Sequence, residues 1–465
     1  MTTENTPFKD DLLNRQEFAN RLYDFLSVEQ KFVDGALVIT LQAPFGSGKT
    51  YFLQNWKTAL EEQRKANQES PRVISLNAWE SDYCGDPLLA LISAILNELD
   101  DKKESSKEKI VEALKDIFHL GIGAGNSIIA ATTPFNLIEI GEHAERKKQE
   151  RHAQKSMTSD VLASLEKKKK ALDTIKIALR ELFEGDTMKA IVMVDELDRC
   201  RPDYAISYLE TIKHIFDIHG MVFILAVDHS QLQATAKSLF GTEMNFDEYL
   251  RKFVQRRVSL PEIETDEDRN GVISHYLEKY LYDEKRKAYF KGSGWAMIEE
   301  IFTLCRPNLR QSQEIFRIIA HTMPRSRGAH FDTPSFSWSV CVVYLSVISV
   351  MQPEFFRRII RNANNFQHIC ENLDNHLKYF KHSNKNWLMR ILTMGCFSSS
   401  KNKEENVAEV LKTLQTLGYE DKYATPAKFE QKVLQHDPEW IFCHLHENVF
   451  QKICTNIVTV KRFAE

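Results

Sequence analysis

Residues 43–50 read Ala-Pro-Phe-Gly-Ser-Gly-Lys-Thr, which places two glycines, a lysine and a hydroxyl residue at a spacing suited to holding phosphate. Glycines let backbone N–H groups turn toward an anion, and the start of a helix adds the positive end of its dipole. We expect the Lys49 ammonium to reach the β- and γ-phosphates of a nucleotide and the Thr50 hydroxyl to bind Mg²⁺. The alternative is an ordinary glycine–serine turn. The residues expected to contact the nucleotide are Pro44, Phe45, Gly46, Ser47, Gly48, Lys49, Thr50 and Tyr51.

A second group of reactive side chains follows the apolar run at 190–194, where Asp195 and Glu196 stand side by side. Ligands of open α/β sheets bind at the carboxyl ends of the strands, so these carboxylates are well placed for chemistry. We expect Asp195 to hold Mg²⁺ through its water shell and Glu196 to polarise an attacking water. Such a pair can also cap a helix, but its combination with the phosphate-binding loop favours metal and water chemistry.

Four short apolar runs, at 36–41, 73–76, 190–194 and 222–227, are predicted to be the buried strands that position these residues. Helical patterns separate them, which predicts an α/β fold with a parallel sheet covered on both faces. The long interval between the two motifs predicts a helical insertion at about 100–185. From about residue 265 onward helical patterns dominate, which predicts an all-α C-terminal region.

The overall composition is that of a globular protein, with 465 residues and 61 Lys and Arg against 65 Asp and Glu. This balance gives no general support for nucleic-acid binding. The eight cysteines are dispersed and form no CxxC pair, which favours free thiols in a reducing compartment. The polar N-terminal residues do not resemble a secretion signal, so a cytoplasmic location is expected.

One segment leaves a membrane or nucleic-acid contact open. Residues 119–138 carry no charge, and residues 142–170 are rich in lysine and arginine. Glycine, asparagine and threonine interrupt the uncharged stretch, so a small-residue insertion is favoured over a membrane span. A second uncharged run, 333–352, is predicted to be a buried core helix.

The two motifs resemble those of the KAP family of P-loop NTPases, and further blocks over about residues 9–330 extend the resemblance. Phe45 stands where the family has an aromatic residue, usually Trp, and residues 195–200, Asp-Glu-Leu-Asp-Arg-Cys, are close to its acidic motif. The other similar blocks are Asn77-Ala78-Trp79, Asp86-Pro87-Leu88, Leu225-Ala226-Val227-Asp228 with Gln231-Leu232, Tyr249-Leu250-Arg251-Lys252-Phe253, and Pro307-Asn308-Leu309-Arg310.

The resemblance implies a P-loop NTPase of the additional-strand, conserved-glutamate type, with ATP and Mg²⁺ as ligands. The resemblance and the helical patterns together predict a nucleotide-binding core at 1–265, a helical lid at 266–330 and a C-terminal helical domain at 331–465. Bacterial relatives often act in defence against phage beside other proteins, which implies partner proteins from the same system, copies of this chain, or both. Many members of the family carry membrane helices between the two nucleotide motifs, at the place where residues 119–138 stand in this chain.

Three further residues are candidates for the catalytic site. Asp228 is a candidate for contact with the water or the γ-phosphate, or else caps the helix that follows it. Arg310 is a candidate γ-phosphate sensor, or else a surface ion-pair residue. Arg251 is the candidate for an arginine finger given to a neighbouring subunit, and it is preferred over Arg256 and Arg257.

Some prominent residues are expected to have structural roles. We expect Trp79 to pack in the core or under the loop, and Arg199 and Arg201 to organise the acidic motif or an interface. Cys443 with His444 and His446 lacks a second half with ligand spacing, so no metal site is predicted there.

Taken together, these features predict ATP hydrolysis that moves the lid and the insertion of this chain and so switches a partner. The alternative is a nucleotide-gated scaffold with negligible turnover, and a weaker alternative is an NTPase that binds nucleic acid or a membrane through its basic insertion.

Overall fold

A computed structural model describes residues 6–9, 11–99, 104–121, 157–281, 293–322, 336–361 and 449–464, and the single residues 284, 287, 290, 412 and 416. The chain forms two compact units, Met1–Pro261 and Glu262–Glu465. Residues 122–156, which hold most of the uncharged stretch and much of the basic one, lie outside this description, as do Cys443, His444 and His446. Within the described ranges no helix is long and apolar enough to cross a membrane.

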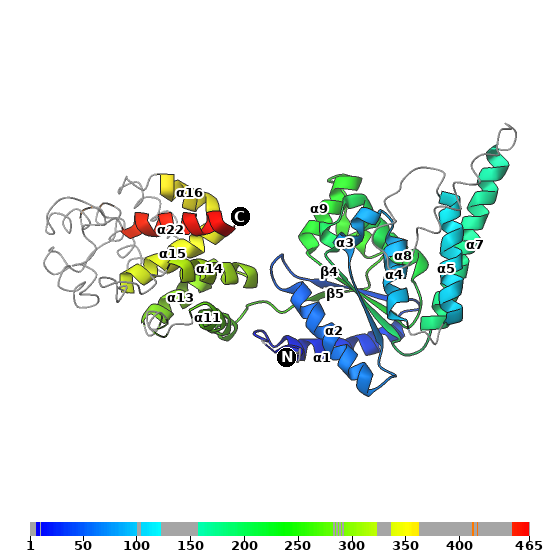
Figure 1. Ribbon diagram of the computed structural model, residues 1–465, viewed down its shortest axis with the longest axis horizontal. Helices are drawn as coiled ribbons and strands as arrows, with labels where there is room; N and C mark the ends of the chain where they lie inside the picture. Colours follow the sequence, from blue (N-terminus) through cyan, green and yellow to red (C-terminus); the bar gives the residue numbers. More distant parts are fainter. Residues whose placement is uncertain are drawn as a thin grey trace. The chain divides into compact units, whose positions relative to one another are not determined.

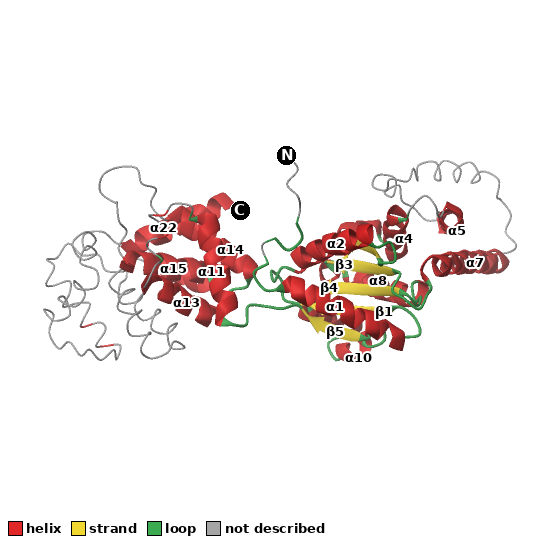
Figure 2. Cartoon of the chain, turned by 90° about the horizontal axis from the view of Figure 1, so that it is seen from below, coloured by secondary structure: helices red, strands yellow, loops and turns green. Residues whose placement is uncertain are grey.

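The first unit is built on a parallel sheet of five strands in the order β2-β3-β4-β1-β5 (Figure 2). The strands are β1 (Leu37–Gln42), β2 (Arg72–Asn77), β3 (Ala190–Asp195), β4 (Met221–Val227) and β5 (Arg256–Ser259). Four of them coincide with the predicted apolar runs, and the fold-class prediction is confirmed. Strand β4 lies between β1 and β3, where the resemblance predicts an additional strand.

Both faces of the sheet are covered, as its buried strands require. Because side chains alternate along a strand, Ile191 and Met193 join one core while Val192 and Val194 join the other. The first core is shared with α1 (Arg15–Glu29) and α2 (Lys49–Ala66). The second is shared with α4 (Pro87–Glu98), α8 (Pro202–Ile215) and α9 (His229–Phe240), and with the helix pair described next.

A pair of long helices interrupts the sheet sequence between β2 and β3. Helices α5 (Glu104–Gly121) and α7 (Met157–Phe183) lie side by side and pack together (Figure 1). Buried Ile110 and Ala113 of α5 and Ile175 and Leu179 of α7 belong to the core on that face of the sheet. The helical insertion of the predicted fold is therefore present.

The second unit is helical throughout its described parts. Its helices are α11 (Asp266–Tyr280), α13 (Ser293–Cys305), α14 (Leu309–Thr322), α15 (Phe336–Met351), α16 (Pro353–Arg361) and α22 (Val449–Ala464). Helix α15 is buried from Ser339 to Ser349, which confirms the predicted core helix. Helix α14 packs against both α11 and α15, so helices on either side of residue 330 share one unit. The division into lid and C-terminal domain stays a prediction.

The strand register brings the two sequence motifs to one edge of the sheet. Asn77 at the end of β2 pairs with Asp195 at the end of β3, and Asp195 pairs with Ala226 of β4. Leu41, near the end of β1, pairs with the same Ala226. The acidic motif and the loop after β1 are therefore neighbours despite their distance along the chain.

Candidate nucleotide-binding site

The loop between β1 and α2 has the backbone needed to surround an anion. Gly46 and Gly48 both have φ of 85°, a left-handed conformation that side chains disfavour. Helix α2 begins at Lys49, and the first N–H groups of a helix have no partner within it, so they are available to a phosphate. The Lys49 ammonium donates to the carbonyl oxygens of Ala43 (2.7 Å) and Pro44 (3.4 Å), which keeps it at the loop. These residues fit a phosphate group.

The remaining predicted contact residues lie on the same loop and helix. Ser47 is buried, whereas Phe45 and Tyr51 are 49% and 41% exposed. Tyr51 lies on the first turn of α2, and its side chain is accessible to solvent.

Arg15 supports the phosphate-binding loop by donating to its carbonyl oxygens, a role that the sequence analysis missed. Its guanidinium donates to the carbonyl oxygens of Ser47 (2.6 Å), Gly48 (3.3 Å) and Pro261 (2.9 Å). Arg15 is only 2% exposed, so these bonds are shielded from water. Because three segments distant in sequence meet at this side chain, no local pattern could have revealed it.

Replacing Arg15 with Met should weaken the first unit, because buried carbonyl groups lose a charged donor. We expect a loss of about 2–3 kcal/mol in the free energy of unfolding, measured by thermal or denaturant unfolding. Arg21→Met is the matched control, since the side chain of Arg21 on the same helix is 77% exposed. Equal stability of the two variants would contradict the supporting role.

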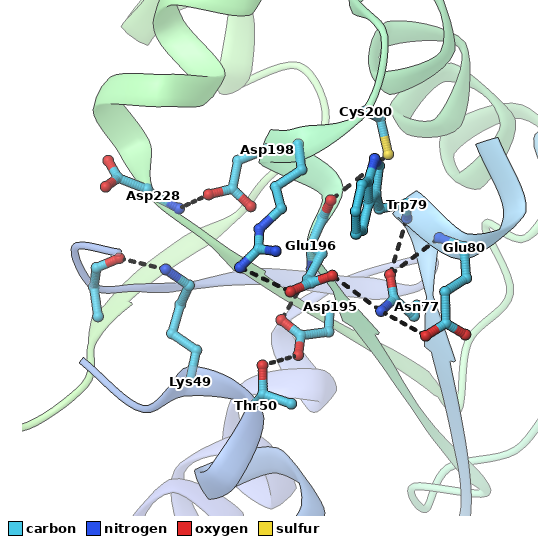
Figure 3. A network of polar contacts seen from close by, with 12 residues as sticks. Lys49, Thr50, Asn77, Trp79, Glu80, Asp195, Glu196, Asp198, Cys200 and Asp228 are labelled. Atoms are coloured by element: carbon cyan, nitrogen blue, oxygen red, sulfur yellow. Dashed lines mark hydrogen bonds and ion pairs between the residues drawn. The ribbon is translucent and has the colours of Figure 1, made fainter. Parts of the chain in front are cut away.

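Thr50 and Asp195 form the direct link between the two motifs. The Thr50 hydroxyl donates to Asp195 Oδ2 at 2.6 Å, and the backbone N–H of Glu196 donates to Asp195 Oδ1 at 2.9 Å (Figure 3). A hydroxyl and a carboxylate are the oxygen ligands that Mg²⁺ prefers, and one or two such protein ligands are usual where phosphates and water complete the coordination. The pair therefore fits Mg²⁺ bound together with a nucleotide.

Burial raises the pKa of Asp195, and the nearby Glu196 carboxylate adds to the rise, while the Thr50 hydroxyl, the Glu196 amide and Lys49 act in the opposite direction. An acid with a raised pKa binds its proton more tightly in the folded state. Folding therefore gains stability as the pH falls through the folded pKa, and loses that contribution as the pH rises again.

The variant Asp195→Asn should accordingly unfold at a higher temperature than the parent near neutral pH. An amide can accept from the Glu196 N–H and donate to the Thr50 hydroxyl. We therefore expect the free energy of unfolding to rise by about 0.5–2 kcal/mol, while the metal-binding carboxylate is lost. The gain should shrink in mild acid, where the parent Asp195 takes up its proton. Thermal unfolding of both proteins across pH checks this, and a loss of stability at neutral pH would contradict it.

Glu196 has a restrained position one residue beyond β3. Its φ of 59° is unusual for a residue with a side chain and is the kind of strain that collects at functional sites. Asn77 Nδ2 donates to Glu196 Oε2 at 3.1 Å, and Arg199 Nη2 lies 2.9 Å from Glu196 Oε1. The Glu196 side chain is 15% exposed. Asn77 and Arg199 are thus site residues whose contacts with Glu196 were not predicted.

Trp79 does not lie in the core, the first of the two places predicted for it. It is 52% exposed, in the short helix α3 (Ala78–Ser81). The Arg199 guanidinium carbon lies 5.7 Å from the centre of the Trp79 ring and 4.7 Å from that of Phe45. Its aromatic character suggested burial, but α3 begins directly after β2, at the edge of the sheet, where the ring faces a cation instead.

Asp228 caps α9, which is one of the two roles considered for it. Its Oδ1 accepts from the Ser230 and Gln231 N–H groups, and its Oδ2 accepts from the Phe45 N–H at 3.2 Å. Partial burial alone would raise the pKa of Asp228, but hydrogen bonds from Ser230 and Gln231 and the charge of Lys49 lower it. Asp228 is therefore an ionised neighbour of the loop, and its contact with water or phosphate stays a prediction.

The two candidate arginines lie on elements other than the P-loop helix and the strand that carries the acidic motif. Arg251 is an exposed residue at the end of α10 (Phe246–Leu250), whereas Arg256 and Arg257 form ion pairs with Glu29 and Asp247. Arg310 lies in the first turn of α14, in the second unit. Their roles toward a γ-phosphate stay predictions.

Cys200, the last residue of the acidic motif, carries a thiol that is difficult to ionise. Burial, together with the charges of Asp82, Asp198 and Glu196, raises the pKa of its thiol to about 12. The thiol therefore stays protonated at neutral pH, and this agrees with the choice of carboxylates as the reactive groups.

A family model described as KAP family P-loop domain matches residues 15–335, which span the loop, the acidic motif and the helices of the second unit up to α14. The chain belongs to the KAP family of P-loop NTPases. The KAP domain of this chain is thus a nucleotide-binding P-loop NTPase domain, and the glycine-rich loop described above is its P-loop.

Comparison with curated proteins gives no match. Among solved structures, the ORC2 protein of Aeropyrum pernix in its ADPNP–ADP complexes is 12% identical, with a TM-score of 0.33 over 99% of this chain and 95% of that chain. The ORC1 protein of the same organism, in complex with DNA, is 11% identical, with a TM-score of 0.33 over 87% of this chain and 83% of that chain. These similarities to the KAP chain are too weak to bear on its function.

Proposed function

We propose that the protein is a Mg²⁺-dependent ATPase that uses hydrolysis to change the conformation of the chain and so to switch a partner. The observation that carries this proposal is the Thr50–Asp195 hydrogen bond, which holds the P-loop helix against the acidic strand end with Glu196 beside it. A phosphate-binding group, a metal-binding pair and a water-polarising carboxylate then share one edge of the sheet.

The residues divide the work as follows. The N–H groups of the loop and the Lys49 ammonium would bind and orient the β- and γ-phosphates. Thr50 and Asp195 would hold Mg²⁺, which when bound supplies neutralisation of the charge that develops on the phosphate oxygens. Glu196 would orient the attacking water and accept its proton at a carboxylate oxygen. Asp228 would hold the P-loop in place by accepting the hydrogen bond from the Phe45 N–H.

Removal of the metal tests this assignment. Phosphate release from ATP should fall by at least about a hundredfold when EDTA is present and return when excess Mg²⁺ is added. Competition with GTP in the same assay would show which base is preferred. Release that continues unchanged in EDTA would contradict a Mg²⁺-dependent mechanism.

A nucleotide-gated scaffold with negligible turnover is the second candidate. It is favoured by the contacts of Glu196, whose two carboxylate oxygens are each engaged by a neighbour. Nucleotide affinity measured beside steady-state phosphate release separates the two functions. Tight binding with no release, in the presence of candidate partners as well, would favour the scaffold.

A role in defence against phage, with partner proteins or further copies of this chain, is supported by the family resemblance alone. Cells that carry the protein with its neighbouring genes should reduce phage plating, and cells with Lys49→Ala should not. Equal plating on cells with the parent and the variant would reject this role.

A further inference from the structure

Arg199 contacts three parts of the site. It lies at the end of the 3-10 helix η6 (Leu197–Arg199), three residues after Glu196, and forms the ion pair with its carboxylate. Its guanidinium also lies over the ring of Phe45 in the P-loop and near that of Trp79 in α3. Both distances are within the range of about 6 Å in which a cation is attracted to an aromatic face.

We propose that Arg199 is a positioning residue that restrains Glu196, and that Phe45 and Trp79 hold Arg199 in the restraining position. The proposal deepens the function proposed above and rests on it, because it concerns the same water-polarising carboxylate. It gives the protein a built-in control on turnover, because Arg199 connects the P-loop with the carboxylate that would activate water.

The chemistry of Glu196 explains why the contact restrains rather than assists. A carboxylate polarises water by offering a lone pair and taking up a proton. An ion pair with the Arg199 guanidinium occupies one oxygen of the carboxylate, while Asn77 occupies the other. A water can therefore use Glu196 as an acceptor only after one of these two contacts is given up.

The position of Phe45 explains how the restraint could be released. Its ring stands on the loop that would close around phosphate, and its N–H donates to Asp228. A movement of the loop therefore moves one of the two aromatic faces that hold Arg199. The side chain of Arg199 is 36% exposed and Trp79 is 52% exposed, so a partner that contacts the protein here can act on the same pair.

Steady-state phosphate release from ATP by the full chain tests the proposal. Arg199→Gln should raise kcat by about fivefold, the order of effect that one exposed ion pair or cation–π contact can have, and should leave KM within about twofold of the parent value. Arg199→Lys, which keeps the charge but loses the planar fork, should lie between the parent and Arg199→Gln. A gain in kcat cannot come from a merely damaged fold.

A double-variant cycle tests the part assigned to the ring. Trp79→Leu should also raise kcat, and the double variant Arg199→Gln with Trp79→Leu should be no faster than Arg199→Gln alone. Tyr83→Leu is the control, because Tyr83 is a comparably exposed aromatic residue, at 54%, in the neighbouring turn, and it should leave kcat unchanged.

Failure of the restraint and failure of the proposed ATPase give different results. If the parent hydrolyses ATP in a Glu196-dependent manner but Arg199→Gln is equally fast or slower, the restraint is wrong and the ATPase stands. If neither the parent nor Arg199→Gln releases phosphate although both bind ATP, the ATPase is wrong and the restraint falls with it.

Discussion

Glu196→Gln should reduce kcat for ATP hydrolysis by about 10²–10⁴-fold while nucleotide binding is retained, since this is the usual contribution of a side chain that accepts a proton in the reaction. The amide can still accept from Asn77, so the local structure around the end of β3 is expected to persist. It cannot accept the proton of a water, and it loses the ion pair with Arg199. Phosphate release and equilibrium binding of a labelled nucleotide check the two halves of the prediction.

The matched control for Glu196→Gln is Glu62→Gln, which removes one negative charge from an exposed position on α2. It should hydrolyse ATP as fast as the parent. If Glu196→Gln keeps the parental rate, another group activates the water and the role given to Glu196 is wrong. If it loses binding together with turnover, Glu196 has a structural or ligand-holding role instead.

Lys49→Ala should weaken ATP binding by at least about tenfold and bring hydrolysis to background, because a positive charge that contacts the β- and γ-phosphates is worth more than one charge-assisted hydrogen bond. In the structure the Lys49 ammonium donates to the carbonyl oxygens of Ala43 and Pro44 in the loop, so it is already close to where phosphate would lie. Isothermal titration with ATP and a steady-state assay measure the two effects.

Lys57→Ala is the control for Lys49→Ala, since Lys57 lies on the same helix and pairs with Glu61 and Glu98 at its surface. It should bind and hydrolyse ATP like the parent, as surface ion pairs contribute little. Parental affinity in Lys49→Ala would place the phosphates elsewhere.

The parts of the site that could be predicted from the sequence are those encoded by neighbouring residues. A buried strand, two glycines and a helix start are read along the chain, and so are the strand and the two carboxylates at 190–196. Parallel pairing then brings both to the carboxyl edge of the sheet, where Thr50 and Asp195 are hydrogen-bonded.

The parts that could not be predicted depend on contacts between distant segments. Arg15 reaches the loop and Pro261 from α1, and Asn77 meets Glu196 only because β2 and β3 are paired in one register. Residue type was misleading at Trp79, because an aromatic ring at the sheet edge is exposed over a cation rather than buried. Arg310 was predicted from its block at 307–310, and its role toward a γ-phosphate stays a prediction.

A crystal structure of Glu196→Gln with ATP and Mg²⁺ is the most direct test of a single nucleotide site built from both motifs. We expect the P-loop amides around the β-phosphate, Lys49 at the β- and γ-phosphates, and Mg²⁺ at about 2.0–2.1 Å from the Thr50 hydroxyl oxygen, with Asp195 holding a water of the metal. A nucleotide bound away from this loop, or a metal that contacts neither Thr50 nor the water shell of Asp195, would contradict the account.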